Sequence, residues 1–131
     1  MKKDIEIPIA KDVYVAIIQE WNEEFLSKDW NAYILNNSTA PIEMVMIISK
    51  GYDDKRKTSV MRHTIGVVDA KSYHKIEVVL EDVLALKNEF FVTYYAGNKL
   101  YEKRFLFEQN SVNEGNLVPI PIIEKDGVLV K

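Results

Sequence analysis

The stretch that most restricts the fold is residues 90–107, which read FFVTYYAGNKLYEKRFLF. Aromatic and branched side chains, which favour extended structure, stand on both sides of Gly97 and Asn98. Glycine and asparagine both tolerate positive φ, so this pair predicts a two-residue type I′ turn between antiparallel strands. The turn fixes the register, because Ala96 must then oppose Lys99 and Tyr95 must oppose Leu100.

This register sorts the hairpin side chains onto two faces. The first face is the better core candidate and carries Phe90, Val92, Tyr94, Tyr101, Lys103, Phe105 and Phe107. The second face mixes charged with apolar groups and carries Phe91, Thr93, Tyr95, Leu100, Glu102, Arg104 and Leu106. Four of these, Phe91, Tyr95, Leu100 and Leu106, form a candidate interaction surface, because apolar groups gathered in this way are normally covered.

Two covers for this surface stay open. The apolar segment at residues 117–123, LVPIPII, belongs to the same chain, and Pro119 and Pro121 keep it out of a central strand. A second subunit in a symmetric dimer is the alternative. We favour the segment of the same chain, because most chains cover their own apolar segments.

Short apolar and β-branched runs recur along the rest of the chain, separated by turn and charged-loop signals. They lie at residues 13–19, 29–37, 42–49, 58–68 and 73–80, and residues 81–88 favour a helical turn. With the hairpin they predict an all-β fold, an antiparallel β-sandwich of about seven strands similar to immunoglobulin and fibronectin type III domains. Trp30 falls on the second strand, where fibronectin-type domains often keep a core tryptophan. We expect a single domain over residues 1–131, with the sandwich core at 12–109 and a C-terminal tail at 110–131 that packs on the sheet.

Residues 12–26 allow a second interpretation. Tyr14, Ile17, Ile18, Trp21 and Phe25 follow helical spacing, and Asp12 could cap such a helix. We favour a strand for the first half, because the run Val-Tyr-Val-Ala-Ile-Ile prefers extended structure. The segment EWNEEFLSKD then becomes the loop of a long hairpin.

The bulk composition excludes several classes of function. Seventeen Lys and Arg against twenty Asp and Glu give a net charge of −3, which offers no footprint for nucleic acid or an anionic membrane. The chain has no cysteine, which removes disulfides and thiolate chemistry. Asp4 and Glu6 interrupt what would be the apolar run of a signal peptide. We therefore expect a cytoplasmic protein that uses no cofactor.

The two histidines are the obvious candidates for chemistry. If residues 68–69 centre a turn, His63 and His74 oppose each other on successive strands, close enough to share a metal with Glu77 or Asp69 as a third ligand. The spacing of the histidines, however, matches no common metal motif. The serines lack a nucleophile elbow, and the five glycines form no phosphate-binding fingerprint.

Three segments, DWNAYILNN, EMVMIISKGY and TSVMRH, resemble a group of short bacterial proteins of uncharacterised role. Some of those proteins carry the description phenylalanyl-tRNA synthetase alpha subunit. A class II synthetase core is much longer than this chain and needs motif arginines and a Gly-rich ATP motif. Arg56, Arg62 and Arg104 are the only arginines here, and no Gly-rich motif follows them, so no catalytic residue is carried over.

The expected function is therefore a non-enzymatic protein-interaction or structural module that binds a protein partner or associates with itself. Two alternatives remain at this point. One is a metal-binding protein or enzyme that uses His63 and His74, and the other is a carrier of a small ligand inside the sandwich.

Overall fold

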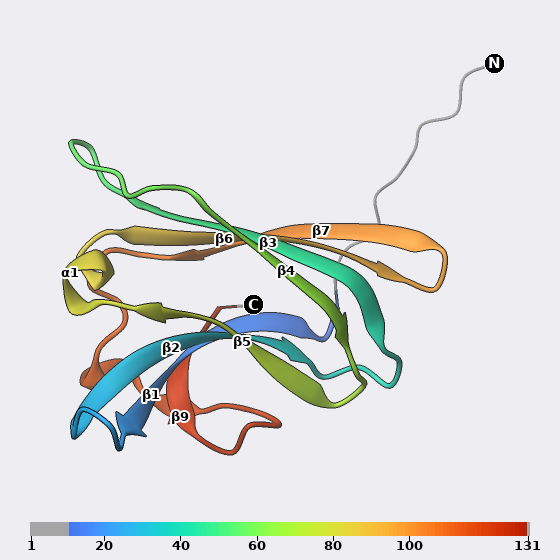
Figure 1. The fold of residues 1–131 in the computed structure, drawn as a ribbon, viewed down its shortest axis with the longest axis horizontal. Helices are drawn as coiled ribbons and strands as arrows, with labels where there is room; N and C mark the ends of the chain where they lie inside the picture. The colour runs from blue at the N-terminus through green and yellow to red at the C-terminus, as the bar shows by residue number, and fades with distance from the viewer. Residues whose placement is uncertain (1–10, 131) are drawn as a thin grey trace.

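The computed structural model describes residues 11–130 and contains two antiparallel sheets packed face to face (Figure 1). The five-stranded sheet has the order β5-β2-β1-β9-β8, and the four-stranded sheet has the order β4-β3-β6-β7. The strands are β1 (Val13–Asn22), β2 (Ser27–Asn36), β3 (Ile42–Tyr52), β4 (Met61–Val68), β5 (Ser72–Val79), β6 (Lys87–Ala96), β7 (Lys99–Phe107), β8 (Val118–Pro119) and β9 (Asp126–Val130). The helical elements are α1 (Glu81–Leu84) and the 3-10 turn η1 (Glu114–Asn116). The predicted all-β sandwich is confirmed; Asp4 and Glu6, which argued against a signal peptide, lie outside the described residues.

The β1–β2 pair shows that the strand interpretation of residues 12–26 is correct. Pairing runs without interruption from Val13 opposite Asn36 to Asn22 opposite Ser27, so the connecting loop is shorter than predicted. Both faces of β1 are buried: Ile17 packs in the core between the sheets, and Ile18 packs on the opposite face under the C-terminal tail. A strand covered on both faces carries a continuous apolar run, which explains why the segment could also be read as a helix.

The β6–β7 hairpin has the predicted register, with Tyr95 opposite Leu100 and Ala96 opposite Lys99. Its first face forms a large part of the core, where the Phe90 and Phe107 rings meet edge to face at 5.9 Å between centroids. Tyr94 and Tyr101 stack at 5.2 Å across the two strands. These aromatic pairs add to the stabilisation that comes from burial alone.

The core lies between the two sheets and receives side chains from both. Trp30 is only 6% exposed and belongs to this core. On β3 the pairing with β6 shifts between Glu43 and Met46, and Met44 takes a positive φ of 50°. This bulge adds one residue and so lets Ile42, which precedes it, and Val45 both face the core.

The C-terminal tail corrects one of our expectations. The short strand β9 pairs with β1, so the tail joins the five-stranded sheet, and Ile120 and Ile123 are buried on the outer side of that sheet. Their neighbours there are Ala16, Ile18, Tyr33 and Leu35. The prediction that the tail covers Phe91, Tyr95, Leu100 and Leu106 is therefore wrong. The tail instead packs on the apolar cluster of the five-stranded sheet, and it supplies β1 with a second hydrogen-bonding neighbour. Pro119 sits on the edge strand β8, the position that proline tolerates.

The α-helix α1 has only four residues, and no helix within residues 11–130 has the length and apolar character needed to cross a bilayer.

Candidate functional site

The two histidines are not brought together. β4 pairs with β3 in one sheet and β5 pairs with β2 in the other, so the predicted β4–β5 ladder does not form. The His74 ring hydrogen-bonds to the backbone of its neighbour, with Nδ1 lying 2.8 Å from the carbonyl oxygen of Lys75. The pairing that would oppose His63 and His74, on which the alternative of a shared metal depended, is therefore absent. The physical reason is that the chain after Val68 crosses from one sheet to the other instead of turning back within one sheet.

His63 takes part in a different polar cluster, at the edge of the sandwich where β4 and β5 meet. Its Nε2 lies 2.7 Å from Glu77 Oε1, and Ser49 Oγ donates a hydrogen bond of 2.6 Å to the same oxygen. The cluster thus links β3 and β4 of one sheet to β5 of the other. Both the serine and the histidine contact the carboxylate, whereas nucleophilic catalysis requires a bond from serine to histidine. Within residues 11–130 there is no group of three His, Asp or Glu side chains that could hold a metal.

A small hollow adjoins this cluster. It has a volume of about 210 Å³ and is lined in part by Ser49, Met61, Glu77, Leu80 and Phe90. Pockets that hold drug-sized ligands usually measure ~300–1,000 Å³. The hollow is therefore small for the carrier function that the sequence left open.

The candidate surface Phe91, Tyr95, Leu100 and Leu106 lies on the outer side of the four-stranded sheet. Tyr95 is 39% exposed and Leu100 is 40% exposed, while Phe91 and Leu106 are half-buried. The pairing with β3 adds Met46, which lies opposite Thr93, and Ile48, which lies opposite Phe91. We call the six residues Met46, Ile48, Phe91, Tyr95, Leu100 and Leu106 the outer patch. Sequence reasoning missed Met46 and Ile48, because their place depends on the bulge at Met44 and on the register of β3 against β6.

Charged side chains at one end of the outer patch form a defined group. The Glu89 carboxylate forms an ion pair with Arg104, whose Nε lies 2.9 Å away, and with Lys50, whose Nζ lies 3.6 Å away. The Tyr52 hydroxyl also donates to Glu89 at 3.2 Å. Two cations thus surround one carboxylate, which leaves this end of the patch positive.

The tip of the β1–β2 hairpin is a second apolar surface, which sequence reasoning missed. Trp21, Phe25 and Leu26 are 53%, 71% and 71% exposed. The tip is held by Asn22 Oδ1, which accepts bonds from the backbone N–H groups of Glu24 and Phe25. Leu26 has a φ of 50°, a conformation that costs a non-glycine residue about 1–2 kcal/mol. The available signal was the presence of Trp and Phe in a segment expected to be a loop.

Glu20 is the centre of a polar network on the outer side of the five-stranded sheet. It accepts hydrogen bonds from the Tyr33 hydroxyl at 2.5 Å and from Asn31 Nδ2 at 2.9 Å, and it pairs with Lys125 of the tail. Burial alone would raise the pKa of Glu20, but the bonds from Lys125, Tyr33 and Asn31 outweigh it and hold the pKa below its ordinary value. Burial and the bond to Glu20 raise the pKa of Tyr33. The network fixes the tail to the sheet as a charged contact.

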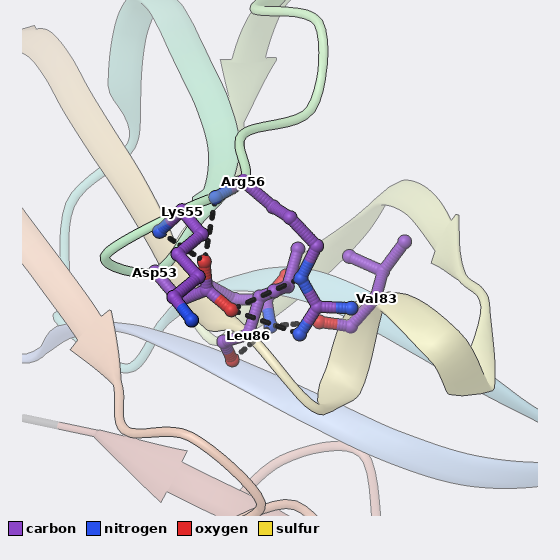
Figure 2. Close-up of polar contacts among 6 residues, drawn as sticks. Asp53, Lys55, Arg56, Val83 and Leu86 are labelled. Carbon is purple, nitrogen blue, oxygen red and sulfur yellow. Dashed lines mark hydrogen bonds and ion pairs between the residues drawn. The ribbon is translucent and has the colours of Figure 1, made fainter.

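The charged loop after β3 is held together by hydrogen bonds among its own residues, as Figure 2 shows. Asp53 accepts bonds from the backbone N–H groups of Lys55 and Arg56 and from the Arg56 guanidinium at 2.8 Å. These bonds, with the backbone of Lys55 the largest cause, lower the pKa of Asp53. Because its oxygens already accept these bonds, Asp53 is a loop-forming residue and a poor cation ligand.

Comparisons of the chain with protein-family models, with curated proteins and with solved structures found no match.

Proposed function

We propose that this protein is a non-enzymatic interaction module of the cytoplasm that binds protein through the outer patch. The observation that carries the proposal is the exposure of neighbouring apolar side chains on a flat strand surface. Met46 on β3, Tyr95 on β6 and Leu100 on β7 are each more than a third exposed. Apolar residues that adjoin one another on a surface and are bordered by charge are typical of protein-binding sites.

The same geometry gives the alternatives less support. His63 contacts Glu77, while His74 lies on the outer edge of the other sheet, so a shared metal has no second imidazole. The hollow beside Glu77 is small, and the core is filled by side chains such as Phe90 and Phe105. These observations favour binding at the surface over chemistry or ligand storage in the interior.

We also infer a relationship to the immunoglobulin and fibronectin type III architecture. Such sandwiches pair the first strand with the second and the second with the fifth in one sheet, and they pair the third, sixth and seventh in the other. The β1–β2, β2–β5, β3–β6 and β6–β7 pairs support this relationship. Because sandwiches of this kind serve many functions, the relationship selects none of them.

Site-specific photo-crosslinking tests the proposal. A photoreactive phenylalanine analogue replaces Tyr95 in the outer patch, and in the control it replaces Tyr73, which is 44% exposed on the other sheet. After irradiation in the native host, we expect discrete protein adducts from position 95 and few or none from position 73. The adduct partner, once purified, should bind the wild-type chain and lose binding to Leu100→Glu. Equal labelling from both positions, or none from position 95, would rule the proposal out.

A further inference from the structure

We infer that the outer patch binds a second copy of this chain, in a symmetric dimer whose facing strands run antiparallel. This inference rests on the proposed function and names the partner. Its basis is the distribution of charge across the four-stranded sheet, which the strand register determines residue by residue.

The outer residues form rows across the sheet, because directly paired residues of antiparallel strands share a face. One row contains Glu43, Tyr95 and Leu100, and the next contains Met46, Thr93 and Glu102. These two rows carry two carboxylates, and their end of the face is negative.

The following rows carry the opposite sign. Ile48, Phe91 and Arg104 form the third row, to which Arg62 of β4 is added, and Lys50, Glu89 and Leu106 form the fourth. Glu89 is neutralised by Arg104 and Lys50, so three cations stand against one carboxylate in these rows. The face is therefore negative at one end of the strands and positive at the other, with apolar side chains in between.

A face of this kind complements itself in only one of two simple arrangements. Two sheets stacked face to face are related by a two-fold axis that lies in the plane between them. An axis parallel to the strands places the acidic end of one copy over the acidic end of the other. An axis perpendicular to the strands reverses the strand direction, so Glu102 faces Arg104 of the second copy and Glu43 faces Lys50 of the second copy. Like charges facing each other cost several kcal/mol in an interface, which selects the second arrangement.

The available area is sufficient for a reversible dimer. Four strands at ~4.8 Å spacing and about seven residues at ~3.4 Å give a flat face of about 450 Å² per copy. Two such flat faces bury about 900 Å², and the protruding side chains add to this area. The total approaches the ~1,000 Å² of a specific interface. An interface of this size is typical of weak association, so we expect a dimer that dissociates on dilution.

Sedimentation and light scattering on the purified chain test the inference. The wild type should approach twice its mass of 15.2 kDa at about 0.5 mM protein. About 1 M NaCl, which shortens the Debye length to ~3 Å, should weaken the dimer. The double variant Glu43→Lys/Glu102→Lys should raise the dissociation constant at least tenfold. Mixing it with Lys50→Glu/Arg104→Glu should restore a dimer that contains one chain of each kind.

Matched controls are Glu23→Lys/Glu24→Lys at the β1–β2 tip and Lys28→Glu/Lys75→Glu on the other sheet, which should leave association unchanged. If Lys50→Glu/Arg104→Glu fails to fold, the salt dependence and the Glu43→Lys/Glu102→Lys variant still decide whether the charged rows stabilise a dimer. A wild type that stays monomeric at about 0.5 mM, or a dimer indifferent to both salt and charge reversal, overturns the inference. A monomer whose position 95 crosslinks to a different protein would overturn the dimer and leave the proposed function standing.

Discussion

Replacement of Glu20 by glutamine should lower the free energy of unfolding, and the loss should depend on pH. Glutamine keeps the shape of the side chain and can still accept hydrogen bonds from Tyr33 and Asn31. It loses the negative charge that strengthens those two bonds and that pairs with Lys125.

The magnitude follows from the three contacts. A hydrogen bond to a charged group contributes about 1.5–3 kcal/mol and a neutral one about 0.5–1.5 kcal/mol, so each of the two bonds loses about 1 kcal/mol. The ion pair adds little, because the Lys125 side chain is 50% exposed and pairs of this kind contribute ~0–1 kcal/mol. We expect Glu20→Gln to lose about 2 kcal/mol at neutral pH in urea unfolding. Glu114→Gln is the matched control, since that exposed carboxylate accepts one bond from Gln19 and should lose less than about 0.5 kcal/mol.

The pH dependence gives the sharper test. Since the pKa of Glu20 is lower in the folded chain than its ordinary 4.5, the unfolded chain binds a proton more readily. The stabilisation is therefore complete above the unfolded pKa and is lost as the pH falls through the folded pKa. The difference between wild type and Glu20→Gln should shrink when urea unfolding is repeated at about pH 3. A difference that is the same at both pH values would refute the assigned role of the charge.

Three further changes test how the chain is held together. Gly127→Ala should release the tail, because a Cβ at that position would lie 2.6 Å from the Ile17 carbonyl oxygen, and limited proteolysis should then cut near β9 while β1–β7 persist. Asn36→Ala should destabilise the chain by about 3 kcal/mol or more in urea unfolding, because the buried amide donates to the carbonyls of Ala40, Val68 and Asp69. Leu26→Gly should raise the melting temperature, since it relieves a positive φ at a cost of little buried surface.

The β6–β7 hairpin could be predicted in detail because everything that determines it is local. The Gly97-Asn98 pair specifies the turn, the turn specifies the register, and the alternation of side chains then specifies which face is core. Phe90, Phe105 and Phe107 are accordingly buried, and Tyr95 and Leu100 are exposed, as the pattern requires.

The relation between β4 and β5 could not be predicted, because it depends on contacts between distant residues. The segment Asp69–Lys71 is compatible both with a hairpin turn and with a crossing between sheets. The crossing is stabilised by Asn36, which lies on β2 and donates to the carbonyls of Val68 and Asp69. The position of His63 and His74 depended on this choice, and the ladder that would have opposed the two histidines does not form.

The prediction of where the C-terminal tail packs was wrong for a related reason. Its apolar composition correctly indicated that it would be buried, but two outer faces were available to receive it. The choice depends on β1, which pairs with β2 along one edge and with β9 along the other. A single sequence does not show which strand edge remains open for pairing. The one local indication that the tail would not cover the hairpin was the presence of charged side chains beside Phe91.

The two outer faces of the sandwich differ in how their apolar residues are covered. On the five-stranded sheet Ile18, Tyr33 and Leu35 belong to one apolar cluster, and the chain covers them with its own tail, which Lys125 also fastens to Glu20. On the four-stranded sheet every row of the outer patch carries at least one charged side chain, and the charges change sign along the strands. Water can solvate such a face in the monomer, while a second copy can replace the water with opposite charges. The physical expectation is therefore a face that stays folded when alone and associates reversibly, with ionic strength and protein concentration setting the balance.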